Sequence, residues 1–68
     1  MELLQNLLLD KLEIKGVPTS FYLTNGIRLR GTVKGFDQHV IMLKGEIVVQ
    51  MIYKHAVSTI VPERNVSI

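Results

Sequence analysis

The spacing of apolar residues changes near Gly16 and Pro18, and this change limits the folds open to the chain. Before it, leucines recur at helical spacing at positions 3, 4, 7, 8 and 12, and Leu9 and Ile14 widen the apolar face. Gly16 suits a helix C-terminus, and Pro18 prevents the helix from resuming. The sequence therefore predicts an amphipathic helix over about residues 3–15, lying on a protein surface.

From Thr19 onward the apolar residues repeat every second position, which is typical of β-strands. Asn25-Gly26 is a strong hairpin signal, because both residues accept positive φ in a two-residue turn. In the strand that follows, apolar residues alternate with three cations. Gly31 and Gly35 lie on the apolar side of this strand, and glycines there favour a sharp bend or a close backbone approach.

Three more short strands complete the predicted pattern. We expect them at 39–43, 47–53 and 56–61, the last ended by Pro62. The fold class is then mainly β with an N-terminal helix, in a strongly bent five-stranded antiparallel sheet or small open barrel. The run Ile47–Ile52 is apolar on both faces, so we expect a neighbouring copy to pair with its exposed edge.

Length and composition narrow the classes further. A chain of 68 residues allows a single domain, residues 1–68, and a domain of this size commonly needs association or another support. The absence of cysteine excludes disulfides and zinc fingers, and two histidines without a ligand cluster predict no metal. The net charge of +2 and pI of about 9.2 would sum in a ring of copies and favour polyanions. The Leu-rich start lacks the features of a signal peptide or membrane span, so we expect a cytoplasmic location.

The stretches YLTNGIRLRGTVKGFDQHVIMLK and QMIYKHAVSTIVP closely resemble the Hfq family, the bacterial Sm-like RNA chaperones. The resemblance runs from about Gln5 to Ser67, with the NG turn, the FDQ turn and the YKHAxST corner in the same order. The turn at Gly45–Val49 is one residue longer than is usual in the family. The resemblance implies a homohexameric ring, with strand four of one subunit pairing with strand five of the next. It also implies two RNA-binding faces, and annealing of small regulatory RNAs to messenger RNAs.

On the helix side, around the pore, the resemblance implies a face for U-rich RNA formed by Gln5, Gln38, His39, Lys54 and His55. Lys54 would bind a uracil carbonyl or a phosphate, and His55 a base edge, ribose or phosphate. His39 stands where the family usually has Phe or Tyr, so stacking there is expected to be weaker and pH-sensitive. From the residues alone, Lys54-His55 also fits a solvated turn, and Gln5 an ordinary polar helix position.

The opposite face would bind A-rich RNA. Tyr22 and Leu29 would sandwich an adenine, Gln50 and Thr59 would read its polar edge, and two arginines would hold phosphates. Arg30 stands where the family commonly has Gln, which puts the adenine-repeat preference in question. The same residues also fit a half-buried strand aromatic and a solvated sheet face. The implied set is Tyr22, Gly26, Ile27, Arg28, Leu29, Arg30, Gln50 and Thr59.

The rim is where the chain departs most from the family. Many members carry an arginine patch at the helix end, whereas this chain has Glu13, Ile14 and Gly16 there, with Lys11 and Lys15 nearby. Lysine lacks the planar fork of arginine. We therefore expect weak rim-assisted annealing, with solvated helix lysines as the simpler interpretation.

No enzyme activity or cofactor is expected. Asp37 in the FDQ turn is expected to bind backbone N–H groups, and the sequence offers no second carboxylate or nucleophile–base pair at useful spacing. Two alternatives to the hexameric RNA-binding ring remain open. One is a small barrel acting as a protein–protein adaptor through its apolar edge, and the other is an Sm-like ring with a different subunit number.

Overall fold

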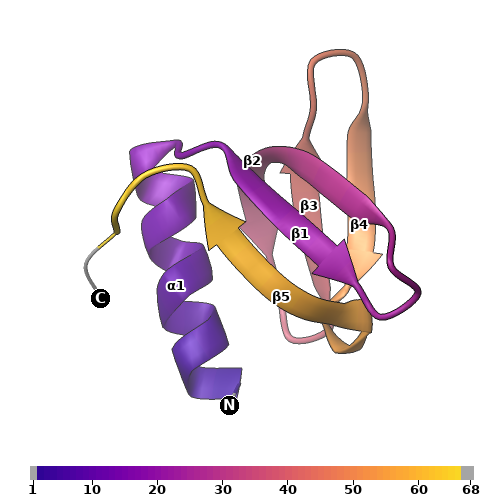
Figure 1. Ribbon diagram of the computed structural model, residues 1–68. Helices are drawn as coiled ribbons and strands as arrows, with labels where there is room; N and C mark the ends of the chain where they lie inside the picture. The colour runs from indigo at the N-terminus through magenta and orange to yellow at the C-terminus, as the bar shows by residue number, and fades with distance from the viewer. Residues whose placement is uncertain (1, 67–68) are drawn as a thin grey trace.

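A computed structural model describes residues 2–66, which form one helix followed by five strands in a single antiparallel sheet (Figure 1). The strand order is β4-β3-β2-β1-β5, so β4 and β5 are the two edges. The predicted fold class is confirmed. Met1, Ser67 and Ile68, which the predicted domain also includes, lie outside the described residues. The elements are α1 (Glu2–Lys15), β1 (Thr19–Leu23), β2 (Arg28–Phe36), β3 (Val40–Lys44), β4 (Val49–Tyr53), the short 3-10 helix η1 (Lys54–Ala56) and β5 (Val57–Pro62).

Helix α1 ends as its sequence predicts. Gly16 takes a positive φ of 62°, and the N–H of Val17 donates to the carbonyl of Leu12 at 3.3 Å. This bond closes the helix C-terminus and satisfies one of its free carbonyl groups. No helix within residues 2–66 is long and apolar enough to cross a membrane.

The apolar face of α1 is narrower than predicted. Leu9 and Leu12 are fully buried, and Leu8 packs against the core. The other large apolar residues of the helix are exposed, because only one stripe of a helix can face a single small sheet. These exposed residues are Leu3, Leu4, Leu7 and Ile14.

The β1–β2 hairpin differs from the predicted two-residue turn. Gly26 has a positive φ of 89°, but Asn25 does not have a positive φ. The N–H of Gly26 donates to the carbonyl of Leu23 at 2.9 Å, and the Asn25 side chain accepts from the N–H of Ile27 at 3.1 Å. A three-residue loop that ends in a glycine with positive φ needs left-handed backbone at the glycine alone.

Strand β2 bends, and its two glycines contribute in different ways. A Cβ atom on Gly31 would lie 2.7 Å from the carbonyl oxygen of Lys44, so this position requires a glycine for close approach to β3. Gly35 has open space around it but lies where the register with β3 shifts between Val33 and Gly35. Such a bulge increases local bending and twist. The predicted curvature therefore arises from one close contact and one irregularity.

The core lies between α1 and the sheet. Helix and strands contribute side chains to one cluster, so the sheet is held by packing as well as by its hydrogen bonds. Fully burying each large apolar side chain contributes roughly 1.5–3 kcal/mol. The cluster consists of Leu9, Leu12, Val17, Phe21, Val33, Ile41, Leu43 and Ile52.

Both edge strands start later than predicted. β4 begins at Val49, and Ile47 is 94% exposed in the β3–β4 hairpin, which projects beyond the rest of the sheet (Figure 1). β5 begins at Val57 because η1 extends to Ala56, and β5 ends at Pro62, which it includes. A proline fits there because β5 pairs only with β1 and its other side is an open edge.

Candidate functional site

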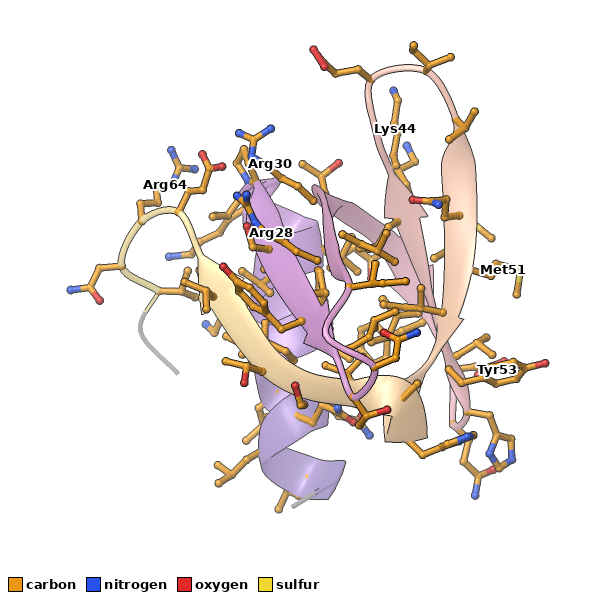
Figure 2. All side chains as sticks on the ribbon, turned by 45° about the vertical axis from the view of Figure 1, so that its right-hand side comes forward. Arg28, Arg30, Lys44, Met51, Tyr53 and Arg64 are labelled. Carbon is orange, nitrogen blue, oxygen red and sulfur yellow. The ribbon has the colours of Figure 1, made fainter. Side chains whose placement is uncertain are left out.

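Three residues predicted for A-rich RNA form a row across adjacent strands. Tyr22 on β1 is paired with Arg28 on β2 and with Thr59 on β5, and all three side chains are exposed. Arg30 follows two positions further along β2, on the same face (Figure 2). An aromatic ring flanked by a cation and a hydroxyl group provides stacking, charge and hydrogen bonding within one small area.

The two arginines are held by side chains outside the predicted set. The Nε–H of Arg28 donates to the hydroxyl oxygen of Ser20 at 3.1 Å, and that of Arg30 donates to the carboxylate of Glu63. The hydrogen bond from Arg30 lowers the pKa of Glu63, and the same bond raises the pKa of Arg30. Glu63 lies 33 positions from Arg30 in the sequence, so spacing along the chain does not reveal this ion pair.

Other residues of the A-rich set lie apart within one chain. Leu29 pairs with Phe21 and packs against the core, so it lies on the opposite face of the sheet from Tyr22. One copy alone therefore cannot sandwich a base between Tyr22 and Leu29. Gln50 lies on β4, where it pairs with Leu43 of β3, at the other edge of the sheet from β5.

The hairpin loop completes this set. Gly26 and Ile27 lie at the turn end of β1 and β2, and Ile27 is half exposed. The apolar side chain of Ile27 is therefore available beside the loop that leads into Arg28. Ile27 thus lies at the same end of β1 and β2 as the Tyr22–Arg28 pair.

Four of the five residues predicted for U-rich RNA, all except Gln5, gather at a different corner. The backbone N–H of Lys54 donates to the carbonyl of His39 at 2.8 Å and joins the turn after β2 to η1. The rings of Tyr53 and His55 stack with centroids 5.6 Å apart, and Gln38 and His39 are exposed beside them. Figure 2 shows Tyr53 well away from Arg28 and Arg30.

Asp37 has the structural role that the sequence predicts. Its carboxylate accepts the backbone N–H groups of His39 at 2.8 Å and Val40 at 2.9 Å. These two bonds hold the pKa of Asp37 below its ordinary value, because they favour the ionised form. Asp37 therefore fixes the backbone that presents His39.

Lys54 is placed differently from the prediction. Its side chain is only 7% exposed, and its ammonium group donates to the side-chain carbonyl of Asn6 on α1. The ammonium group also lies 5.2 Å from the centroid of the Phe36 ring, a cation–π distance. In a single chain Lys54 is thus part of the packing between the corner and the helix. Sequence reasoning missed Asn6.

Gln5 lies one residue before Asn6, next to a groove between α1 and β5. The groove has a volume of about 410 Å³ and is lined by Leu4, Gln5 and Leu8 together with residues 57–60. Its lining is mostly apolar side chains, with Gln5, Ser58 and Thr59 as the polar ones. The groove runs beside the open edge of β5.

Arg64 lies at the C-terminal end of α1, where only Lys11 and Lys15 were predicted as cations. Lys11 and Lys15 are exposed, and the guanidinium of Arg64 donates to the backbone carbonyl of Lys15 at 3.4 Å. A cation near a helix C-terminus interacts favourably with the helix dipole. Figure 2 shows Arg64 on the same side as Arg28 and Arg30.

A helix packed on a bent, open five-stranded antiparallel sheet of this order defines the Sm-like fold. A family model described as Hfq protein matches residues 4–67. The chain is also similar to a crystal structure of the pleiotropic translational regulator Hfq, with a TM-score of 0.84 and 27% identity. That match covers 88% of this chain and 91% of the other.

The chain belongs to the Hfq family, which confirms the resemblance. Family and fold together support a general role as an RNA-binding chaperone. The Hfq family is a family of non-enzymatic RNA-binding proteins that oligomerise.

Proposed function

We propose that the chain is an RNA-binding chaperone that acts as a homohexameric ring in the cytoplasm and promotes pairing of small regulatory RNAs with messenger RNAs. A-rich RNA would bind the face of the sheet that points away from the core, around Tyr22, Arg28 and Arg30. U-rich RNA would bind the corner around His39 and His55.

The row of Arg28, Tyr22 and Thr59 carries this proposal. Single-stranded RNA is bound by stacking its bases on exposed rings while cations hold its phosphates. An exposed tyrosine directly beside an arginine on a rigid sheet meets both needs. The second arginine two positions along the same strand extends the basic surface.

The two open edges support assembly into a ring. β4 and β5 are unpaired on their outer sides within the described residues, and β4 exposes Val49, Met51 and Tyr53. Pairing of β4 with β5 of a neighbouring copy would cover this apolar surface. It would also place Gln50 on β4 and Thr59 on the neighbour's β5 in one continuous sheet, so residues at opposite edges of one chain would meet at the same junction.

The U-rich face would depend most on the exposed rings. His39 and His55 are accessible for stacking and hydrogen bonding, and Gln38 lies on the same turn as His39. Lys54 would contribute through its position at the corner, with its ammonium group redirected from Asn6 when RNA is bound. Repetition of the corner around a ring would multiply weak contacts in each copy.

Binding of U-rich and A-rich oligonucleotides at several salt concentrations tests the proposal. We expect two non-competing sites, each weakening steeply with salt because phosphates release counterions. His55→Ala should weaken U-rich binding and spare A-rich binding, and Tyr22→Ala should do the reverse. Equal losses in both assays would contradict a division into two faces, and no binding at low salt would favour the protein–protein adaptor.

The rate at which two RNAs anneal tests the contribution of the helix-end rim. Lys11 and Lys15 offer charge without an arginine fork, so their contribution to pairing two RNAs should be small. Replacing both by Gln should reduce the annealing rate only slightly while leaving affinity for each RNA nearly unchanged. A large loss of annealing would show that these lysines form a working rim.

A further inference from the structure

A hollow lined by both polar and apolar groups lies beside Arg30, at the end of β2 that approaches the β3–β4 hairpin. It has a volume of about 460 Å³, enough to admit a nucleobase. Figure 2 shows Arg30 and Lys44 at this same end of the molecule. Apart from Arg30, its lining does not belong to the RNA sites described above. The lining residues are Pro18, Arg30, Gly31, Thr32, Lys44, Gly45 and Glu46.

The charges around the hollow balance. Arg30 and Lys44 are cations in its wall, Glu46 is a carboxylate in its wall, and Glu63 binds Arg30 directly. The pKa of Arg30 is raised chiefly by the hydrogen bond to Glu63, with the charge of Glu46 as the smallest cause. A wall with no net charge gives little attraction to an isolated phosphate. It suits a neutral ligand that presents donors and acceptors in separate groups.

Glu63 determines which part of Arg30 meets a ligand. It binds the Nε–H, which leaves the two terminal amino groups of the guanidinium for other partners. Arg30 remains about half exposed, so these groups are accessible. An arginine held by a carboxylate in this way keeps its planar fork in a defined orientation.

We propose that this hollow is a nucleobase subsite selective for guanine, an inference that rests on the proposed RNA binding. The fork of Arg30 donates to the O6 and N7 acceptors of guanine, and the carboxylate of Glu46 accepts from its N1–H and N2 amino groups.

Adenine fits this arrangement poorly. Beside its N7 acceptor it presents the N6 amino donor, which meets a second donor on Arg30. A glutamine at this position offers one donor and one acceptor and therefore matches adenine. Arg30, which offers donors alone, therefore favours guanine over adenine in this hollow.

The test compares an adenine-only oligonucleotide with one in which some adenines are replaced by guanine. We expect the guanine-containing RNA to bind roughly tenfold more tightly. Replacing guanine by 7-deazaguanine removes the N7 acceptor and should abolish most of the gain. Inosine, which lacks the N2 amino group, should retain part of it.

Three substitutions separate the roles of the residues. Arg30→Lys keeps the charge but removes the fork, and Glu46→Gln removes one of the two acceptors, so each should abolish the guanine preference. Glu46 lies outside the A-rich site, so Glu46→Gln should leave binding of adenine-only RNA unchanged. Glu63→Gln should reduce the preference by loosening Arg30. Asp10→Asn, an exposed helix position outside these sites, is the matched control and should leave the preference unchanged.

Equal affinity for both RNAs in the unsubstituted protein would overturn the guanine subsite while leaving RNA binding intact. A guanine preference that survives both Arg30→Lys and Glu46→Gln would overturn it as well. Failure to bind either RNA would overturn the proposed function, and the subsite with it.

Discussion

The ammonium group of Lys54 donates a hydrogen bond to the side-chain carbonyl of Asn6, 48 positions earlier in the chain. Lys54 is the first residue of η1, and Asn6 lies in the second turn of α1. A buried ammonium group requires a partner, because it has lost most of its contact with water. This bond therefore ties the corner that carries the predicted U-rich site to the helix.

Removing the acceptor should destabilise the fold. Asn6→Ala leaves the ammonium of Lys54 without this partner, and we expect the free energy of unfolding to fall by about 1–3 kcal/mol. Asn6→Asp retains an acceptor and should recover most of the loss. Urea unfolding monitored by circular dichroism measures both, and equal stability of Asn6→Ala and the unsubstituted protein would contradict a structural role for this bond.

Glycine should be required at only one of the two positions inside β2. Gly31→Ala places a Cβ 2.7 Å from the carbonyl oxygen of Lys44, and backbone cannot move aside easily. We expect a loss of about 1–3 kcal/mol in unfolding free energy. Gly35→Ala meets open space and is the matched control, for which thermal melting should show a much smaller change.

Acid should weaken the turn at Asp37. Because the folded-state pKa of Asp37 lies below its ordinary value of 3.8, its stabilising contribution is complete above that value and is lost as the pH falls through the folded-state pKa. Asp37→Asn, which cannot ionise, should make the unfolding free energy less dependent on pH in this acidic range. Glu63→Gln should act in the same direction, because the pKa of Glu63 is lowered by Arg30. Denaturant titrations at a series of acidic pH values provide the measurement, and an unchanged slope in Asp37→Asn would contradict the assignment.

A charge on the β4 edge should weaken assembly. Met51 is 62% exposed on this strand, and lysine on an edge opposes pairing with another strand. We expect Met51→Lys to weaken association by about tenfold or more, as for a central interface residue. Ile14→Lys changes an equally apolar exposed residue on α1 and should leave assembly unchanged. Sedimentation velocity at several concentrations distinguishes these outcomes, and a β4 variant that assembles normally would exclude this edge.

A better stacking ring at position 39 should strengthen U-rich binding. His39 is exposed, and its backbone is held by Asp37 whatever its side chain is. His39→Phe should therefore keep the turn intact and raise affinity for U-rich RNA by roughly threefold to tenfold. His39→Ala should lower it, and fluorescence anisotropy with a U-rich oligonucleotide measures both. Unchanged affinity in both variants would show that this side chain does not contact bases.

Local sequence signals predicted most of the elements. The helix end at Gly16, the strand alternation after Thr19 and the backbone role of Asp37 each depend on residues a few positions apart, and the structure confirms them. The predicted two-residue turn at Asn25-Gly26 was wrong at Asn25. Two different hairpin loops share that dipeptide, and only the backbone of the neighbouring strands selects between them.

The partners of the functional residues were not predictable in this way. Asn6 with Lys54, Glu63 with Arg30, and Arg64 with Lys15 are brought together by contacts across 33 to 49 positions. Several other charged or polar surface residues are chemically able to form such pairs. The order of residues along the chain does not indicate which of these pairs forms. The same applies to the helix, whose leucines on one stripe are buried while others remain exposed.

The sequence by itself therefore determined the fold class, the family resemblance and the candidate residues for RNA, because periodicity, turn chemistry and motif order are local properties. Only the tertiary structure decided that Tyr22 and Leu29 lie on opposite faces, that Lys54 is buried and that Arg30 is paired. These outcomes depend on the register of the strands and on where α1 packs against them. Both are set by the burial of apolar side chains from all parts of the chain together, and no short stretch of sequence fixes them.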